Sequence, residues 1–341
     1  MSIAEQIAVV GAGAWGTALA DYLARRGYRV GLWAHEADVV YSINHFQENR
    51  RFLAGFPIAE TVEATSDLRG LLASTTLIVI VIPTQHIRRV LEPVADQISE
   101  TAAILCASKG IEAETLKTVP ELLRSVLPDK CHRLALLSGP SFAKDLMHGR
   151  PTAVVAAAQD IQFAQEIQAA ISSMSLRVYV TEDLAGVALG GSVKNVIAIA
   201  AGVSDGLGLG DSARSALITR GLAEMIRLGV KYDANPLTFS GLSGMGDLVL
   251  TCCGELSRNR QVGMRVGKGQ PIDSILSGLE QAVEGVHTSQ AIHALQERHQ
   301  IELPICEGVF QVLFGGHDPV QAMHDLMRRD LRHERHGIDQ F

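Results

Sequence analysis

The chain has 341 residues, of which 47% are hydrophobic and 20% are charged, and its formal net charge at pH 7 is -7. A chain of this length can form two domains that each bury a core, and its composition excludes general disorder. The acidic balance argues against a general nucleic-acid binder, although it leaves room for a local basic pocket that binds a phosphorylated small molecule.

The start of the chain and its cysteines bear on where the protein resides. Residues 1–6 have neither the basic nor the apolar region of a secretory signal, and the longest strongly apolar run, residues 77–82, is too short to span a bilayer. The five cysteines are irregularly spaced, which favours reduced thiols over disulfides or a metal site. We therefore expect a cytoplasmic protein with no membrane span and no metal.

The first motif is a glycine-rich turn. The apolar strand Gln6–Val10 is followed by GAGAWG at Gly11 and then by a helical pattern over residues 17–26. In such a turn the first glycine permits the tight bend, Gly13 lets a pyrophosphate approach the backbone, and Gly16 lets the helix and strand pack closely. The motif alone is weak evidence, but its position between strand and helix predicts binding of NAD or NADP.

The end of the second strand, Arg29–Trp33, bears on the choice between NAD and NADP. An acidic side chain there would bind the ribose 2'-hydroxyl and repel a 2'-phosphate. His35 and then Glu36 follow the strand, so no acid stands directly at its end. His35 with Arg50 or Arg51 could receive a 2'-phosphate, or these could be solvated surface charges, and both cofactors remain open.

Strands and helical segments continue to alternate in the first half. Buried strands are predicted at residues 77–82, 103–107, 134–137 and 152–156, and helices at 87–98 and 114–127. This alternation predicts a Rossmann-like, doubly wound parallel sheet, in which ligands bind beyond the carboxyl ends of the strands.

Three loops leave those carboxyl ends, at residues 83–85, 108–110 and 138–144. Lys109 directly follows a buried strand, so we expect it to point into the ligand cleft rather than to be an ordinary surface lysine.

The alternation ends near Thr181, and the remaining segments are predicted to be helices. They cover residues 184–203, 212–228, 259–266, 275–279, 288–298, 305–313 and 319–327. We therefore expect a dinucleotide-binding domain over residues 1–181 and an all-α domain for substrate binding and catalysis over residues 182–341.

Lys194 is the only charge in the long apolar run of residues 184–203. It could extend to the surface on its flexible stem or form a structural ion pair. Alternatively, Gly190 and Gly191 share its helix face and leave a notch where another molecule can approach. Partial desolvation would lower its pKa, which suits a general acid or base near neutral pH. Lys194 is therefore a catalytic candidate.

Two glycine-rich or polar loops in the second half could line the same site. Residues 241–248 contain the isolated carboxylate of Asp247, which could instead cap a helix. Ser257, Arg258 and Asn259 stand at a predicted helix start and combine a hydroxyl, a guanidinium and an amide. That set is suited to hold a phosphate, although it could also be an ordinary basic helix start.

Eight motifs follow one another along nearly the whole chain. They are GAGAWGTALA at Gly11, SKGIEAET at Ser108, SGPSFAKDL at Ser138, GVALGGSVKNVIAIAAGVSDGLGLG at Gly186, ALITRGLAEM at Ala216, GLSGMGDLVLTC at Gly241, SRNR at Ser257 and VEG at Val283. Together they resemble the bacterial NAD(P)-dependent sn-glycerol-3-phosphate dehydrogenases. The long lysine motif and SRNR are specific, whereas the glycine turn alone is not.

The resemblance implies reversible reduction of dihydroxyacetone phosphate to sn-glycerol 3-phosphate, a precursor of glycerophospholipids. It makes Lys194 the proton acceptor in the oxidative direction, and Asp247 would hold its ammonium group in place. The substrate contacts implied are Lys109, Gly139, Ser141, Lys194, Asp247, Ser257, Arg258 and Asn259. The cofactor contacts implied, beyond Gly11, Gly13 and Gly16, are Ala14, Trp15, His35, Lys109, Ala143, Arg258, Val283 and Glu284.

Two departures and two alternatives accompany this resemblance. Ala14 replaces a serine that is frequent in the family, and His35 stands where arginine or histidine is usual. The chain could instead be another lysine-dependent dehydrogenase, of the 2- or 3-hydroxyacid or ketopantoate type, or a non-catalytic nucleotide sensor. We expect a homodimer, although the residues themselves fix neither the oligomeric state nor feedback regulation.

Overall fold

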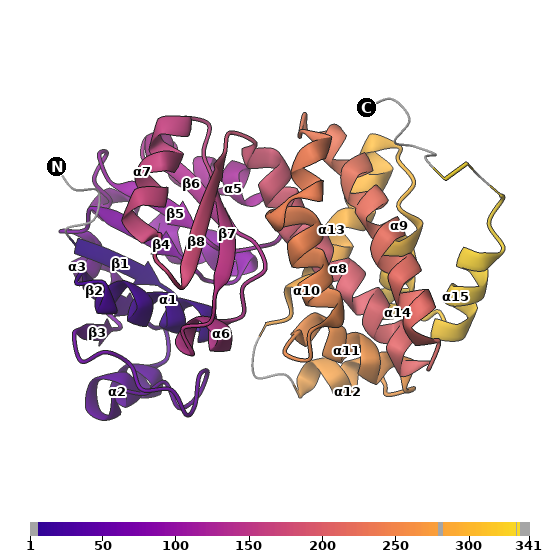
Figure 1. Cartoon of the computed structure of the whole chain (residues 1–341), viewed down its shortest axis with the longest axis horizontal. Coiled ribbons are helices and arrows are strands. Elements are labelled where there is room, and N and C mark those ends of the chain that lie inside the picture. Colours follow the sequence, from indigo (N-terminus) through magenta and orange to yellow (C-terminus); the bar gives the residue numbers. More distant parts are fainter. Residues whose placement is uncertain (1–5, 279–281, 332, 335–341) are drawn as a thin grey trace. The chain divides into compact units, whose positions relative to one another are not determined.

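The computed structural model describes residues 6–278, 282–331 and 333–334, and the chain divides into two compact units (Figure 1). The first comprises residues 1–108 and 120–184, and the second comprises residues 109–119 and 185–341. The boundary after residue 184 lies three residues from the expected one. The sequence did not anticipate that residues 109–119 belong to the second unit.

The first unit, called here the nucleotide unit, is built on one eight-stranded sheet. Its strands are β1 (Gln6–Val10), β2 (Arg29–Trp33), β3 (Val62–Thr65), β4 (Leu77–Ile80), β5 (Ala103–Cys106), β6 (Leu134–Ser138), β7 (Thr152–Ala157) and β8 (Leu176–Thr181). The spatial order is β3-β2-β1-β4-β5-β6-β7-β8, so the Rossmann-like sheet is confirmed, with its topological switch point between β1 and β4. β4 and β5 are buried at every position, as expected of central strands covered on both faces.

One part of the sheet differs from the prediction. β7 pairs antiparallel with β6, so the sheet is mostly rather than wholly parallel. The connection between these strands contains only α6 (Ala143–Met147), a five-residue helix. Such a short helix does not cover a sheet face as a parallel crossover does, and the chain therefore turns back beside β6. The prediction also missed β3 and β8.

Helices flank this sheet. They are α1 (Ala14–Arg25), α2 (Ala37–Phe46), α3 (Leu68–Leu72), α4 (Ile87–Leu91), α5 (Val119–Val126), α6 and α7 (Ile161–Ile171). The helix expected over residues 87–98 changes after α4 into a 3-10 helix, Glu92–Gln97, because Pro93 cannot donate the next α-helical hydrogen bond. The helix expected from residue 114 begins only at Val119, because the preceding residues form a hairpin closed by Ile111 and Thr118.

The second unit, called here the helical unit, is all-α apart from that hairpin, as predicted. Its helices are α8 (Leu184–Gly206), α9 (Gly210–Val230), α10 (Asp247–Cys253), α11 (Arg258–Gly267), α12 (Ile272–Ser277), α13 (Glu284–His299), α14 (Pro304–Phe314) and α15 (Pro319–Met327). The prediction missed α10. The predicted end of the helix that became α12, Leu279, lies outside the described residues.

The core of the helical unit forms around α8. This helix is long and apolar enough to cross a membrane by length and composition alone. However, 89% of its most apolar window is buried inside the protein, as expected of the central helix of a bundle. Ile111 of the 109–119 hairpin is fully buried in the same core, which explains why this hairpin belongs to the helical unit.

Candidate active site

The packing of α8 places Lys194 inside the helical unit. Its side chain is only 8% exposed. A Cβ atom at Gly190 would lie 2.6 Å from the carbonyl oxygen of Ser243, so this glycine lets the backbone of residues 243–244 approach α8. The notch inferred from the sequence is thus filled, at Gly190, by the protein's own π-helical turn, Leu242–Gly246, rather than left open for another molecule.

That turn leads directly into α10 and sets the position of Asp247, its first residue. The cap position is taken by Gly246, so Asp247 is not the capping aspartate considered as the alternative. Its Oδ1 accepts a hydrogen bond from Lys194 Nζ at 2.5 Å, and its Oδ2 accepts one from Lys109 Nζ at 2.7 Å. One carboxylate that is 2% exposed therefore joins two ammonium groups.

Lys109 reaches this carboxylate from the hairpin of the helical unit. Ser192 on α8 is fully buried and its hydroxyl lies within hydrogen-bond distance of the carbonyl oxygen of Gly110, at 3.0 Å. This contact ties the start of the hairpin to α8 two residues before Lys194. The three charged groups therefore belong to one compact unit.

Burial and neighbouring charges shift the pKa values of both Lys194 and Asp247. Burial lowers the pKa of Lys194 to about 8, with the charge of Lys109 acting in the same direction and Asp247 opposing it. Burial alone would raise the pKa of Asp247, but the charges of Lys109 and Lys194 lower it overall. Lys194 can therefore gain or lose a proton near neutral pH while Asp247 stays ionised.

Thr251 is a member of this cluster that the sequence analysis missed. Its hydroxyl donates to the backbone carbonyl of Asp247 at 2.6 Å and accepts a hydrogen bond from Lys194 Nζ at 2.9 Å. The available signal was its spacing, since residues four apart on a helix lie on one face. Because no helix was predicted over these residues, that spacing could not indicate that Thr251 lies beside Asp247.

The SRNR motif divides into residues with different roles. Ser257 caps α11 by accepting a hydrogen bond from the backbone N–H of Arg260, as an ordinary helix start would. Arg260 turns inward and pairs with Asp205 at 2.7 Å. Arg258 is exposed and donates to the carbonyl oxygen of Ala282 at 2.9 Å.

Two amides connect this motif to the lysine helix. Asn259 donates to Oδ1 of Asn195, the residue after Lys194, at 3.0 Å. Its own Oδ1 accepts from the backbone N–H of Gly285 at 3.0 Å. Val283 is the N-cap residue of α13 and Glu284 is its first residue, so these two lie near Asn259. These hydrogen bonds link Asn259 to residues adjacent to Lys194 and Glu284, and Asn195 is a polar member that the sequence analysis did not select.

The glycine turn of the nucleotide unit has the backbone that its motif requires. Gly11 has a φ of +120°, and a Cβ at Gly16 would lie 1.9 Å from the carbonyl oxygen of Gly11. At Gly13, in contrast, a Cβ would meet nothing within 4 Å. Gly13 is the N-cap of α1 and provides no capping side chain, so the first N–H groups of α1, from Ala14 and Trp15 onward, are available to an anion. These features fit a dinucleotide pyrophosphate.

Asn49 holds this turn, although the sequence gave no reason to select it. It is fully buried, and its Nδ2 donates to the carbonyl oxygen of Ala12 and to the hydroxyl of Thr17, both at 2.8 Å. Arg50 and Arg51, which follow it, make surface ion pairs with Glu48 and Asp38. These two arginines are thus surface charges in this structure, which was the alternative to a contact with the 2'-phosphate.

The remaining predicted contacts also lie beyond strand ends of the nucleotide unit. His35 is exposed after β2. Gly139, directly after β6, has a φ of +142°, and a Cβ there would lie 2.9 Å from the Cα of Val154. The hydroxyl of Ser141 donates back to the carbonyl oxygen of Gly139 at 3.1 Å, and Ala143 begins α6.

Comparison with known proteins matches both units to one family. A family model described as the N-terminus of NAD-dependent glycerol-3-phosphate dehydrogenase matches residues 6–164, and the model of its C-terminus matches residues 183–324. A protein of Geobacter sp. strain M21 named glycerol-3-phosphate dehydrogenase (NAD(P)+) is 47% identical over 333 residues, covering 97% of this chain and 99% of its own.

Solved structures agree with this match. Glycerol-3-phosphate dehydrogenase from Coxiella burnetii has a TM-score of 0.90 at 39% identity, covering 96% of this chain and all of that one. A ketopantoate reductase from Ralstonia eutropha has a TM-score of 0.57 at 14% identity, with 94% and 100% covered. The likeness to the reductase is therefore one of fold alone.

Proposed function

The chain belongs to the family of NAD-dependent glycerol-3-phosphate dehydrogenases, and from this premise we propose that Lys194 carries the proton of the reaction. The reaction is the reversible, NAD(P)-dependent interconversion of dihydroxyacetone phosphate and sn-glycerol 3-phosphate. The observation that supports the role of Lys194 is its buried contact with Asp247, together with a pKa of about 8.

The proton step uses groups of the helical unit alone. Bound NAD(P)H supplies the hydride that reduces the ketone carbon. As the ketone oxygen gains negative charge, Lys194 stabilises it and then donates a proton to it from Nζ, leaving a neutral amine. In the opposite direction the neutral amine accepts the proton of the alcohol. Asp247 and Thr251 hold Nζ in place, since each accepts a hydrogen bond from it.

Substrate attraction follows from the charge of the same cluster. Two ammonium groups, Lys109 and Lys194, share the single carboxylate of Asp247, so the cluster carries net positive charge when both lysines are protonated. A phosphorylated ketone is an anion that this charge attracts. Arg258 is the member of SRNR that we assign to the phosphate, because the residue is exposed and, within the described residues, makes no ion pair of the kind that holds Arg260.

A substitution at Arg258 tests that assignment. Arg258→Ala should raise the KM for dihydroxyacetone phosphate strongly. The same substitution should change the rate with unphosphorylated dihydroxyacetone far less. Arg260→Lys, which retains a cation toward Asp205, serves as the matched control. Equal effects of Arg258→Ala on both substrates would show that Arg258 does not bind the phosphate group.

The activity itself is tested by following NAD(P)H oxidation with dihydroxyacetone phosphate, with ketopantoate and without substrate. Turnover with dihydroxyacetone phosphate alone is the expected result, and running the assay with NADH and NADPH gives the cofactor preference. Turnover with ketopantoate alone, or with neither substrate, would contradict the proposal. We also place the enzyme in the cytoplasm as a homodimer that feeds glycerophospholipid synthesis, on the strength of its family.

A further inference from the structure

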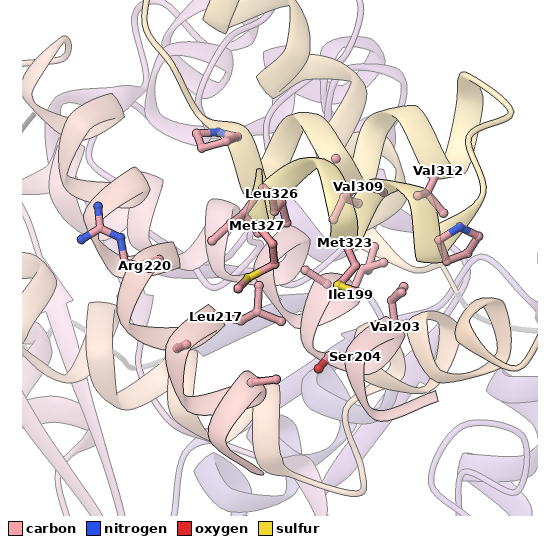
Figure 2. Close-up of a pocket in the computed structure, with 18 of the residues that line it drawn as sticks. Ile199, Val203, Ser204, Leu217, Arg220, Val309, Val312, Met323, Leu326 and Met327 are labelled. Carbon is pink, nitrogen blue, oxygen red and sulfur yellow. The ribbon is translucent and has the colours of Figure 1, made fainter. Parts of the chain in front are cut away.

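A cavity of about 350 Å³ lies in the helical unit among α8, α9, α14 and α15 (Figure 2), and its lining includes neither Lys194 nor Asp247. Its walls are chiefly aliphatic and include Ile199, Val203, Leu217, Val309, Met323 and Leu326. Protein interiors contain few voids larger than a water molecule, and ligand pockets begin at about 300 Å³. The cavity is therefore of ligand size.

The apolar face of α15 covers this cavity. Pro319, Ala322, Met323 and Leu326 recur at helical spacing, and all four line the cavity while remaining half-buried. No residue of α15 is fully buried. The apolar stripe of this helix is thus only partly covered by the protein, with Leu326 packed against the core, and an apolar occupant would bury the rest.

The lining of the cavity also includes charged groups. Five charged side chains are part of its lining, and four of them are paired: Arg329 pairs with Glu302 at 2.7 Å, and Arg227 lies 4.0 Å from Glu224. The fifth, Arg220, donates to the carbonyl oxygen of Glu334 and makes no ion pair within the described residues. Among these five described side chains, positive charge therefore exceeds negative charge by one, and the set complements an anion.

Ser204 supplies a second polar point in the apolar wall. It is 3% exposed, and its hydroxyl has no hydrogen-bond partner among the described residues. Figure 2 shows it well separated from Arg220. Asp205, the next residue of α8, pairs with Arg214 on α9, and Arg220 lies six residues farther along α9, a rise of about 9 Å.

We propose that this cavity binds a single-chain amphiphile that carries a carboxylate at one end and a hydroxyl on its chain. The carboxylate pairs with Arg220, the methylene chain lies against Leu217 and Met323, and the hydroxyl reaches Ser204. The proposal follows from two groups along an apolar wall: a cation that makes no ion pair within the described residues, and a hydroxyl that has no hydrogen-bond partner there.

Two straight-chain probes test the proposal by calorimetric titration, without reference to activity. We expect 10-hydroxydecanoate to bind wild-type protein about 3- to 10-fold more tightly than decanoate, because the free energy of one hydrogen bond corresponds to an affinity ratio of that size. Ser204→Ala should abolish that difference. Arg220→Gln should weaken both probes about tenfold, whereas Arg298→Gln, at an exposed arginine on α13, should weaken neither.

A further variant fills the cavity without disturbing the fold. Gly308 on α14 lines the cavity, and a Cβ there would meet nothing within 4 Å. Gly308→Leu should therefore fold, keep its dehydrogenase activity and lose binding of both probes. Absence of saturable binding to wild type would show that something else fills the cavity in solution, such as a second copy of the chain, and would overturn the proposal. So would equal affinity for the two probes, or unchanged binding by Gly308→Leu.

Discussion

Two aspartates of the helical unit are each held between two cations, but the cations differ. Asp247 accepts hydrogen bonds from Lys194 and Lys109 at 2.5 and 2.7 Å. Asp205 pairs with Arg260 and Arg214 at 2.7 and 2.8 Å. The two geometries are alike, and each carboxylate joins separate segments of the chain.

The difference lies in what the cations can do. A guanidinium stays protonated under all ordinary conditions, and the hydrogen bond that Arg214 donates to Asp205 raises the pKa of Arg214 further. A buried ammonium gives up its proton more readily, and burial lowers the pKa of Lys194 to about 8. The arginine cluster can therefore only join α8, α9 and α11, whereas the lysine cluster can also exchange a proton.

The largest expected effect comes from removing the exchangeable proton. Lys194→Ala should lower kcat about 100-fold or more, which is the scale of lost general acid catalysis, while cofactor binding changes little. Arg214→Ala, the matching truncation in the other cluster, should leave kcat nearly unchanged. Steady-state kinetics with dihydroxyacetone phosphate and a cofactor titration by fluorescence measure both quantities.

Lys194→Arg sharpens this test because it keeps the positive charge and loses the exchangeable proton. It should be nearly as impaired as Lys194→Ala. Turnover close to wild type in either variant would remove Lys194 from the proton step.

The second effect concerns stability. Asp247→Asn leaves the buried ammonium of Lys194 and the half-buried one of Lys109 without a carboxylate, and breaking a buried pair in this way costs about 3–5 kcal/mol of unfolding free energy. Asp205→Asn should cost less, because its side chain is 10% rather than 2% exposed and its arginines reach solvent more easily. Urea denaturation of the two variants measures the difference. A larger loss in Asp205→Asn would reverse the ranking of the two clusters.

The third effect is on pH dependence. Oxidation of glycerol 3-phosphate needs neutral Lys194, so its rate should rise with pH through about 8, and reduction of the ketone should fall over the same range. Asp247 raises the pKa of Lys194, so in Asp247→Asn both limbs should move to lower pH. Profiles of kcat/KM in both directions test this. Limbs that stay in place would mean that another group titrates.

The comparison also shows what a sequence can reveal. The sheet, the glycine turn and most long helices were predictable, because apolar period and glycine spacing are local properties. Lys194 stood out because it is the only charge in an apolar run. Its partner Asp247 stood out as an isolated carboxylate in a glycine-rich loop, and its role of holding the ammonium of Lys194 was expected through the family resemblance.

What could not be predicted depends on long-range packing. Nothing in the sequence near Lys109 indicates that its hairpin leaves the nucleotide unit, since that follows from burial of Ile111 in the helical core. Asn49 supports the glycine turn from 37 residues away, through the carbonyl oxygen of Ala12. The inward turn of Arg260 depends equally on Asp205, which lies 55 residues earlier.

The smallest effect should come from Thr251, whose hydroxyl accepts a hydrogen bond from Lys194 and donates one to the carbonyl oxygen four residues earlier. Thr251→Val keeps the shape of the side chain and removes one partner of the ammonium. We expect kcat to fall about 3- to 10-fold, the value of one hydrogen bond, and the pKa seen in the pH profile to fall as well.

Thr219→Val provides the matched control. Thr219 makes the same hydrogen bond to the carbonyl oxygen four residues earlier, Ser215 on α9, but its side chain is exposed and contacts no lysine. Thr219→Val should leave both kcat and the pH profile unchanged. Thr251→Ser, which keeps the hydroxyl, should have the kcat and pH profile of the wild type. A threonine that only stabilised helix α10 would affect stability without shifting the pH profile. An unshifted pH profile in Thr251→Val would therefore mean that Thr251 stabilises α10 and takes no part in the proton step.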